Sequence, residues 1–315
     1  MSRKLVVAAK ARRADGVVEL RLRDPAGGVL PEWSPGAHVD VRCGPGLVRQ
    51  YSLCGDPADA GEYRIAVLHE PESRGGSRAL HDDVGEGTLL EVSEPRNHFW
   101  LERADRYLFV AGGIGITPIL PMLAEAQRRG RPWRLIYGGR TRTSMAFLDE
   151  LRGHGEKVRA VPQDECGLLD LPRALAGLPE GTLVYCCGPE PLLAAMEAAC
   201  AGAGLSSALR VERFSPKPRE DDEPAGNAEF DVELADTGVR LTVPADRTLL
   251  DVLRDAGVDV LTSCEEGTCG SCETTVLRGE PDHRDSVLTD DERAQGDRLM
   301  VCVSRSATPV LVLDL

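Results

Sequence analysis

Hydrophobic and polar positions change their pattern twice along this chain, which predicts three structural regions. Up to about residue 103, short alternating runs such as VVELRLRD, AHVDVRC and YRIAVLH are separated by Gly, Pro and Asp. This pattern is typical of an antiparallel sheet or a small β-barrel. From Tyr107 onward, apolar runs (YLFVAG, WRLIYGG, KVRAV, TLVYCCG) alternate with helical segments (PILPMLAEAQRR, SMAFLDEL, PEPLLAAMEAACAG). That alternation predicts a parallel α/β sheet.

The second change is a segment rich in Pro, Gly and charge, SPKPREDDEPAGNAE, which we interpret as a linker. Beyond it, FDVEL and VRLTV predict a hairpin, Thr248 to Ala256 a helix with Thr248 as its N-cap, and Thr289 to Glu292 a capping box. The runs VCVS and PVLVLDL are expected to be strands, and mixed strands around one main helix favour a β-grasp domain. The expected domains are residues 1–103 (antiparallel β-barrel), 104–214 (parallel α/β), 215–228 (linker) and 229–315 (β-grasp).

Composition adds a prediction about the compartment. A chain of 315 residues is long enough for two or three domains. It has no run of 18 apolar residues that would predict a membrane span, and its first residues, MSRKLVVAAKARRADG, lack a signal-peptide pattern. Ten cysteines without such a signal predict a cytoplasmic protein, because thiols in a reducing compartment bind metals or lie buried.

The net charge of −14 is concentrated at one end of the chain. Residues 223–315 contain 20 acidic and 8 basic side chains, a balance of −12, whereas residues 1–222 contain the other 31 (51 − 20) and 29 (37 − 8), a balance of −2. This surplus predicts a docking surface for a basic partner, which electrostatic attraction would guide. A solvated face that serves only solubility is the alternative. The negative sign argues against nucleic-acid binding.

Four cysteines near the C-terminus carry the most specific chemical signal. Cys264, Cys269 and Cys272 follow the spacing C-x4-C-x2-C, and 29 residues (302 − 272 − 1) separate the third from Cys302. This is the spacing of plant-type 2Fe–2S clusters. Glycines between the close cysteines, at 267 and 270, let backbone N–H groups turn toward the sulfurs. A structural zinc site is the alternative, since zinc also takes four thiolates.

Two glycine-containing turns predict a dinucleotide site. The strand YLFVAG runs into GGIGITP and then a helix, so the backbone could approach a pyrophosphate at a helix N-terminus. The strand TLVYCC likewise ends in Cys187-Gly188-Pro189 before a helix. Two such turns at the ends of parallel strands form a crevice of the kind in which open α/β sheets bind ligands. Arg140 and Arg142, after the strand WRLIYGG, could face an adenosine phosphate or ribose. Ordinary turns and surface charge are the alternatives.

The first region contains residues that suit a flavin. Arg49 and Tyr51 are two apart on an expected strand and share a face, so a guanidinium and an aromatic ring lie side by side. The run Ser73–Ser77, SRGGS, could cradle a phosphate. Without the rest of the chain, ordinary strand and loop residues would explain both. A nicotinamide, however, gives two electrons together and a 2Fe–2S cluster accepts one, so a carrier such as flavin must stand between them.

These motifs together resemble a known family. RQYSL, SRGGS, PRNHF, GGIGITP, YCCGP and the C-terminal CEEGTCGSC…C occur in the order seen in the phthalate dioxygenase reductase and vanillate demethylase reductase family, over nearly the whole chain. This family belongs to the ferredoxin–NADP reductase superfamily and has a plant-type ferredoxin fused at its C-terminus. The resemblance implies that Arg49 holds the flavin, with Tyr51 against the ring and Ser52 near N5. It assigns the flavin phosphate to Arg74, Gly75, Gly76 and Ser77.

The resemblance also implies the remaining sites and the cofactors. The pyrophosphate and nicotinamide crevice would be lined by Gly113, Gly115, Thr117, Pro118, Cys187 and Gly188. Phe214 would cover the flavin until nicotinamide displaces it, although a core Phe at a strand end is the alternative. The expected flavin is FMN, while related reductases use FAD. NADH is the expected donor, although Arg140 and Arg142 would also suit the 2′-phosphate of NADPH.

The resulting hypothesis is an electron-transfer reductase without a nucleophile or general base. Electrons would pass from NAD(P)H through flavin to the cluster on Cys264, Cys269, Cys272 and Cys302. A separate oxygenase, either a Rieske non-haem iron oxygenase or a haem monooxygenase, would receive them on the acidic C-terminal domain. A stand-alone diaphorase-like reductase and an iron–sulfur redox sensor are the alternatives.

Overall fold

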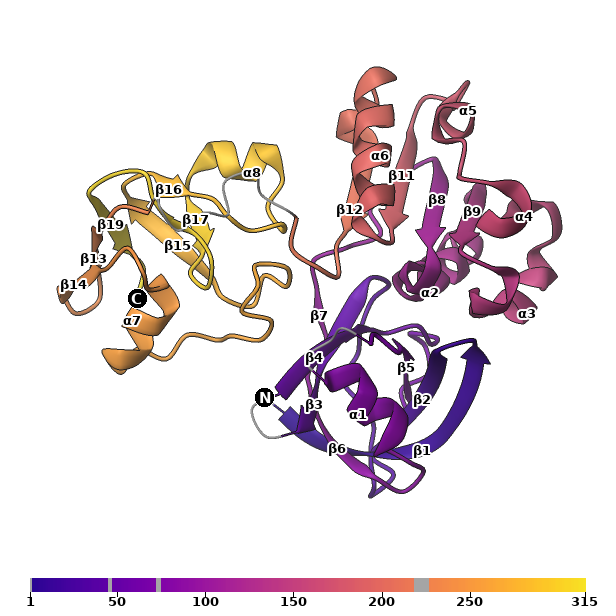
Figure 1. Ribbon diagram of the computed structural model, residues 1–315, viewed down its shortest axis with the longest axis horizontal. Coiled ribbons are helices and arrows are strands. Elements are labelled where there is room, and N and C mark those ends of the chain that lie inside the picture. Colours follow the sequence, from indigo (N-terminus) through magenta and orange to yellow (C-terminus); the bar gives the residue numbers. More distant parts are fainter. Residues whose placement is uncertain (1, 45–46, 72–74, 218–226) are drawn as a thin grey trace. The chain divides into compact units, whose positions relative to one another are not determined.

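The computed structural model describes residues 2–44, 47–71, 75–217 and 227–315, and it divides into two compact units (Figure 1). The first unit is Met1–Glu212 and the second is Arg213–Leu315. The predicted fold class is confirmed: the first unit combines an antiparallel barrel with a parallel α/β sheet, and the second contains a mixed five-stranded sheet with a helix. Among the described residues, no helix is long and apolar enough to cross a membrane.

The first sheet closes into a barrel. Its strands run in the order β4-β3-β6-β1-β2-β5, with antiparallel pairs throughout and β7 beside β3. A bridge between Leu53 and Ile65 joins the two outer strands, so the sheet has no long free edge. Alternate residues point inward, which is why VVELRLR places Leu20 and Leu22 in a fully buried core. The strands are β1 (Ser2–Ala14), β2 (Val17–Arg23), β3 (Ala37–Gly44), β4 (Leu47–Ser52), β5 (Tyr63–Leu68), β6 (Leu89–Ser93) and β7 (Arg96–Asn97).

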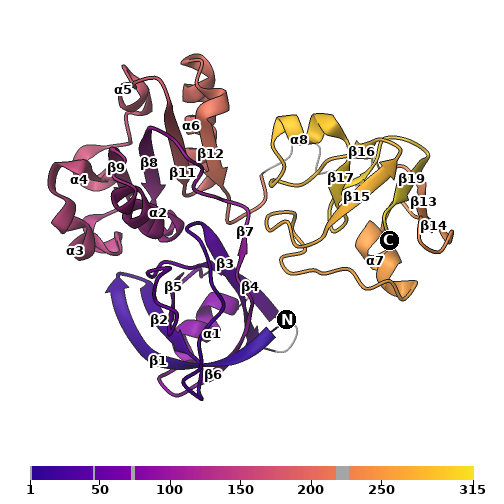
Figure 2. The ribbon, with the colours of Figure 1, turned by 180° about the vertical axis from the view of Figure 1, so that it is seen from behind.

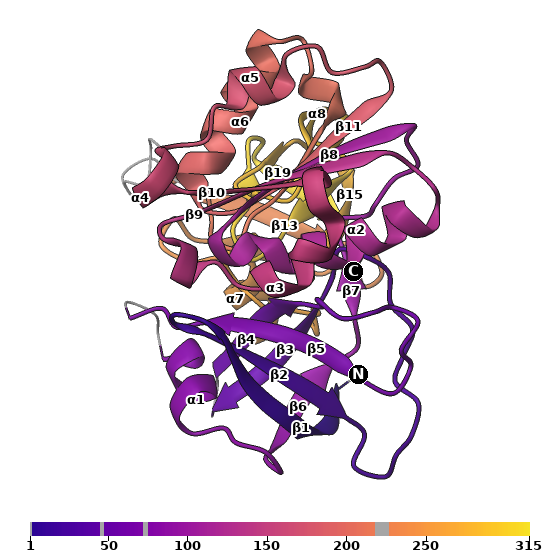
Figure 3. The ribbon, with the colours of Figure 1, turned by 90° about the vertical axis from the view of Figure 1, so that its right-hand side faces the viewer.

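One short helix, α1 (Gly76–Asp82), covers an end of this barrel (Figures 1 and 3). It contacts β3, β4 and β5, and its own Leu80 is completely buried. The Nζ atom of Lys10 donates to the carbonyl oxygens of Leu80 (3.1 Å), His81 (2.5 Å) and Val84 (2.6 Å) at its C-terminal end. A cation at this end also stabilises the helix dipole, so β1 holds α1 in place.

The second sheet is wholly parallel, with the strand order β10-β9-β8-β11-β12. Its central strand is buried on both faces because helices cover each side (Figures 2 and 3). Phe109 and Ala111 pack with α2, while Leu108 and Val110 pack with α5 and α6. The strands are β8 (Arg106–Gly112), β9 (Trp133–Gly139), β10 (Val158–Pro162), β11 (Thr182–Cys187) and β12 (Leu209–Glu212). The helices are α2 (Ile116–Arg128), α3 (Leu148–Leu151), α4 (Gln163–Cys166), α5 (Leu171–Leu175) and α6 (Glu190–Gly202). Short 3-10 segments are η1 (Gly113–Gly115), η2 (Arg142–Ser144), η3 (Arg152–Lys157) and η4 (Ser206–Ala208).

The second unit has the strand order β14-β13-β19-β15-β17. The predicted hairpin and both predicted helix caps are present: Thr248 accepts from the N–H of Asp251, and Thr289 forms a capping box with Glu292. Leu249, Leu250 and Leu253 of α7 enter the core of this unit. Its elements are β13 (Phe230–Leu234), β14 (Arg240–Val243), α7 (Leu249–Asp255), β15 (Glu273–Arg278), β16 (Pro281–Asp282), α8 (Asp290–Gln295), β17 (Arg298–Met300), β18 (Arg305–Ser306) and β19 (Val310–Leu313).

Two element predictions are corrected by the structure. The run SMAFLDEL is helical only over Leu148–Leu151, because Phe147 has a left-handed backbone with φ of 64°. The run VCVS is not a strand: β17 ends at Met300, and its carbonyl oxygen accepts from the N–H of Val303 (3.1 Å) and Ser304 (2.9 Å). This turn places Cys302 in hydrogen-bond contact with Cys272 and close enough to Cys264 to interact electrostatically.

Candidate cofactor-binding sites

The two motifs predicted to bind flavin meet between β4 and α1. Arg49 and Tyr51 lie on β4 opposite Val41 and Val39 of β3, and both are half-buried. Gly76 is buried at the start of α1, and a Cβ atom there would lie 2.6 Å from Cγ of Arg49. A residue without a side chain is therefore needed for this approach. The structure thus brings Arg49 to the Gly75–Gly76 turn, as a shared phosphate site requires.

Hydrogen bonds hold this turn in shape. Gly75 has φ of 98°, a conformation that L side chains rarely adopt. The Oγ atom of Ser77 accepts from the N–H of Glu70 at 3.1 Å and lies 3.4 Å from its carbonyl oxygen. Ser52 is buried next to Tyr51, whose pKa is raised by burial, so the phenol stays neutral. Arg74 lies outside the described residues.

The two predicted nucleotide turns are in contact at the centre of the parallel sheet. The strand order reverses between β8 and β11, which is where open α/β sheets bind ligands. A Cβ atom on Gly115 would lie 2.3 Å from the carbonyl oxygen of Cys187 and 2.6 Å from the backbone nitrogen of Gly188. The hydroxyl of Thr117 donates to the carbonyl of Ile114 at 2.9 Å, so the turn before α2 is braced. Gly113, with φ of 54°, belongs to the same turn, and Pro118 is buried in the first turn of α2.

A carboxyl group that the sequence did not single out lies beside this crevice. Glu212 ends β12 directly opposite Cys187, with Sγ and Oε2 3.9 Å apart. Burial raises the pKa of Glu212 to about 8 and that of Cys187 well above its usual value. Both groups are therefore mostly protonated at neutral pH. The signal available in the sequence was an acid at the carboxyl end of an expected strand, which is too common to identify a site.

The two arginines after β9 differ in their surroundings. Both are exposed, but Arg142 forms a bidentate ion pair with Glu165, with Nε–Oε1 and Nη2–Oε2 distances of 3.0 and 2.6 Å. The carbonyl oxygen of Arg140 accepts from the N–H of Asp164 at 3.2 Å. Two acids at the start of α4 therefore lie close to these arginines. Phe214 is the second residue of the second unit, and 44% of its surface is exposed.

The four cysteines of the C-terminal motif gather in the second unit as two thiol pairs. Hydrogen bonds link Cys264 with Cys269 and Cys272 with Cys302, and Cys264 also interacts electrostatically with both members of the second pair. Because Cys269 donates to it, the pKa of Cys264 is lowered to about 5. Among the described residues, no group of three or more His, Cys, Asp or Glu is arranged to hold one metal ion. Two pairs suit a cluster of two irons better than a single zinc ion.

Backbone N–H groups of this loop point at sulfur, as predicted. Glu266 and Thr268 donate to Sγ of Cys264 at 3.3 and 3.4 Å, and Ser271 donates to Sγ of Cys269 at 3.4 Å. Gly267 and Gly270 make this possible, since both have φ of 69°. Such donors stabilise negative charge on sulfur and so tune a cluster's reduction potential.

Comparison with known proteins agrees with this geometry. Residues 232–307 match a family described as a 2Fe-2S iron-sulfur cluster binding domain. Phenoxybenzoate dioxygenase subunit beta of Ectopseudomonas oleovorans is 47% identical over 313 residues, covering 99% of this chain and 97% of that protein. A vanillate O-demethylase oxidoreductase of Pseudomonas sp. (strain HR199 / DSM 7063) is 40% identical over 320 residues, covering 99% of each.

Solved structures also match over the whole chain, and two of them are informative here. Phthalate dioxygenase reductase, described as a modular structure for electron transfer from pyridine nucleotides to [2Fe-2S], matches with a TM-score of 0.71 and 40% identity over 98% of its length. An intact type IV self-sufficient cytochrome P450 monooxygenase matches with a TM-score of 0.93 and 49% identity, but this chain spans only 41% of that protein. The chain belongs to the phthalate dioxygenase reductase and vanillate demethylase reductase family, and it is an oxidoreductase that carries electrons from a pyridine nucleotide through a flavin to a 2Fe–2S cluster as the reductase component of an oxygenase system.

Proposed function

We propose that residues 1–103 bind FMN, residues 104–214 bind NADH, and residues 229–315 hold the 2Fe–2S cluster, with 215–228 as the linker. The approach of Arg49 to Gly76 carries the flavin assignment, because it joins a ring-binding strand to a phosphate-binding turn. Arg49, Tyr51 and Ser52 hold the flavin, and Gly75, Gly76 and Ser77, with Arg74, hold its phosphate. A single phosphate cradle of this kind supports FMN rather than FAD.

NADH binds in the crevice formed by the turns after β8 and β11. Gly113, Gly115, Thr117 and Pro118 line one side, and Cys187 and Gly188 line the other. A Cβ atom on Gly115 or Gly188 would crowd the backbone of the opposite turn. Because burial raises the pKa of Glu212 to about 8, the carboxyl beside Cys187 is mostly protonated at neutral pH and can donate a hydrogen bond there. Phe214 covers the flavin when nicotinamide is absent.

Arg140 and Arg142 face the adenosine end, and their acidic neighbours support NADH over NADPH. Arg142 is already paired with Glu165, and a 2′-phosphate would bring a second negative group close to that carboxylate. Repulsion between the 2′-phosphate and the Glu165 carboxylate would oppose the binding of NADPH.

The flavin, when bound, accepts two electrons from NADH and releases them singly to the cluster. The side chains and backbone of this chain position the cofactors and stabilise the charges on them. Cys264 and Cys269 hold one iron, and Cys272 and Cys302 hold the other, as their pairing in the structure suggests. The N–H groups of Glu266, Thr268 and Ser271 stabilise the thiolates.

A separate oxygenase docks on the acidic C-terminal domain. Residues 223–315 carry a balance of −12, and the segment before Cys264 exposes 66% of Leu261 beside Asp259 and Glu265. An exposed apolar side chain on an acidic domain suits a partner with a basic rim and an apolar centre. The relatives named as subunits of dioxygenases and monooxygenases support an oxygenase as this partner, either a Rieske non-haem iron or a haem protein. No disulfide joins any of the ten cysteines, all of which lie among the described residues, and this supports a reducing compartment such as the cytoplasm.

The visible spectrum and single-turnover kinetics of the purified protein test this proposal. Flavin and 2Fe–2S bands should appear together, FMN should be released on denaturation, and NADH should bleach both chromophores in turn. Cys272→Ser should keep flavin reduction and lose cytochrome c reduction. If Cys272→Ser reduces cytochrome c at the wild-type rate while flavin reduction is normal, the order of carriers is wrong.

A further inference from the structure

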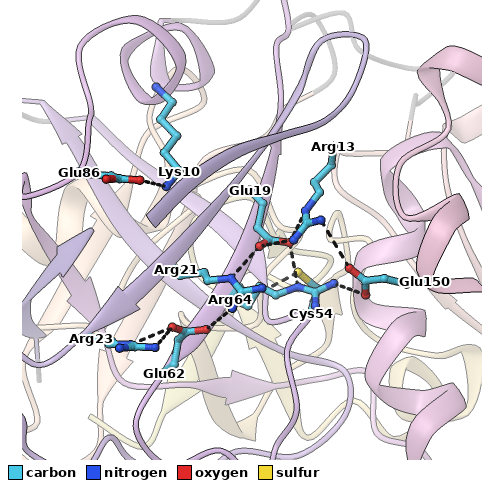
Figure 4. A network of polar contacts seen from close by, with 10 residues as sticks. All are labelled: Lys10, Arg13, Glu19, Arg21, Arg23, Cys54, Glu62, Arg64, Glu86 and Glu150. Carbon is cyan, nitrogen blue, oxygen red and sulfur yellow. Dashed lines mark hydrogen bonds and ion pairs between the residues drawn. The ribbon is translucent and has the colours of Figure 1, made fainter. Parts of the chain in front are cut away.

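A cluster of four charged residues connects the barrel to the parallel α/β part of the first unit (Figure 4). We call Arg13, Glu19, Arg64 and Glu150 the interdomain ion cluster. Glu19, on β2, is only 1% exposed and accepts hydrogen bonds from Nε and Nη2 of Arg13 at 2.8 and 2.9 Å. Nε of Arg64, on β5, lies 3.1 Å from the same carboxylate. Burial opposes the charge of Glu19, but these arginines outweigh it and lower its pKa, so Glu19 is ionised.

Arg64 pairs with one acid from each domain. Its Nη2 donates to Oε2 of Glu150, on α3, at 2.8 Å, while Nη1 of Arg13 lies 4.0 Å from Oε1 of Glu150. The guanidinium of Arg64 also lies 4.8 Å from the ring centroid of Phe147, which is 3% exposed. Arg21 also donates from Nε to Oε1 of Glu19 at 3.0 Å, so three arginines face this carboxylate, and one of them, Arg64, lies over an aromatic ring. Arg64 would remain paired with Glu19 if Glu150 lost its charge.

Each side of the cluster connects to a cofactor site. On the barrel side, the carbonyl oxygen of Arg64 accepts from the N–H of Cys54 at 2.8 Å, two residues after Ser52 on the flavin strand. On the other side, α3 follows Met145, which packs so closely on Gly139 that a Cβ atom there would lie 2.3 Å from Cγ of Met145. Gly139 ends β9 immediately before the predicted nucleotide residue at 140. The cluster therefore links the flavin strand to the edge of the sheet that binds nucleotide.

A backbone hydrogen bond joins the same two surfaces. The N–H of Asp15, between β1 and β2, donates to the carbonyl oxygen of Thr143 in η2 at 2.8 Å. With this second contact, loss of the Glu150 pair should change the angle between the domains without separating them.

We infer that Glu150, acting through Arg64, is a positioning residue that sets the distance between nicotinamide and flavin for hydride transfer. The inference rests on the proposed flavin and nucleotide sites. Hydride transfer needs its reacting atoms about 3–3.5 Å apart, and a misplacement of about 1 Å can cost about 100-fold in rate. Glu150 touches neither proposed cofactor site, so its loss should slow transfer and leave nucleotide binding unchanged.

The test compares Glu150→Gln with Asp149→Asn in full-length protein loaded with flavin and cluster. Asp149 is the adjacent residue of α3, 86% exposed, and it pairs only with Arg152 of its own segment among the contacts described, at 3.0 Å. Stopped-flow flavin reduction over a range of NADH concentrations separates the limiting rate constant from the dissociation constant. For Glu150→Gln we expect the limiting rate to fall about 10- to 100-fold, with the dissociation constant within about twofold. Asp149→Asn should match wild type, and Glu150→Asp should recover part of the rate.

Several results would overturn the inference. These are a Glu150→Gln limiting rate within about twofold of wild type, an equal loss in Asp149→Asn, or a loss that appears only in the dissociation constant. The thermal midpoint of each variant shows whether the fold is intact. Wild-type protein that NADH cannot reduce would instead refute the proposed function.

Discussion

The contact between Arg49 and Gly76 provides a direct test of the flavin site through Gly76→Ala. The Cβ atom of alanine would lie 2.6 Å from Cγ of Arg49, against about 3.4 Å for an ordinary contact. One of the two must move by about 0.8 Å (3.4 − 2.6). Arg49 is a flexible side chain, whereas Gly76 is held in α1, so the guanidinium should be displaced and the fold retained. Alanine also has the higher helix propensity, which supports the stability of α1.

The expected loss follows from the bond that Arg49 would make. A hydrogen bond to a charged group contributes about 1.5–3 kcal/mol, and every 1.4 kcal/mol is tenfold in affinity, so FMN should bind about 10- to 150-fold more weakly. Titration of apoprotein with FMN, followed by flavin fluorescence, measures this change. Gly85→Ala is the matched control, because a Cβ atom there meets nothing within 4 Å and the residue lies just beyond the same helix.

Unchanged FMN affinity in Gly76→Ala, with an unchanged thermal midpoint, would refute the placement of the flavin phosphate beside Arg49. A comparable loss of affinity in Gly85→Ala would show instead that the whole α1 region is sensitive to substitution.

Three further predictions concern the nucleotide crevice. Gly115→Ala would place Cβ 2.3 Å from the carbonyl oxygen of Cys187 and push the two turns apart. Flavin reduction by NADH should then fall about 100-fold, while the flavin content stays normal. Gly153→Ala is the control, because a Cβ atom there meets nothing within 4 Å. Glu165→Gln frees Arg142, so the ratio of kcat/KM for NADPH to that for NADH should rise about two- to fivefold at low salt; an unchanged ratio would place the 2′-position elsewhere. The raised pKa of Glu212 gives a contribution to stability that is fully present below its ordinary pKa of 4.5 and is lost as pH rises through about 8. Glu212→Gln should remove this contribution, so the difference in unfolding free energy between wild type and variant, measured by urea titration at pH 5, 6.5 and 8, should change with pH; a constant difference contradicts the assigned protonation.

Local patterns predicted elements well where a strong period or cap was present. The alternating runs of the first region form barrel strands, the continuous apolar runs form buried parallel strands, and Thr248 and Thr289 cap helices as their spacing indicated. The failures are at places where distant contacts override local preference. Phe147 adopts φ of 64° while its ring packs under Arg64 of the barrel, and the segment after Met300 turns where Cys302 joins its partners.

The sequence by itself predicted the proposed cluster ligands, because a metal motif depends on residue types at short spacing, and it also predicted the two turns that are proposed to line the nucleotide crevice. Only the tertiary structure decided which separate motifs share a site. Arg49 and Gly76 are 27 positions apart, and Cys187 and Glu212 are 25 apart, yet strand pairing and helix placement bring each pair together. The interdomain ion cluster is the extreme case, since Glu19 and Glu150 carry no signature that local periodicity could reveal. Charges that pair across domains are specified by the packing of whole domains, which a single sequence does not display.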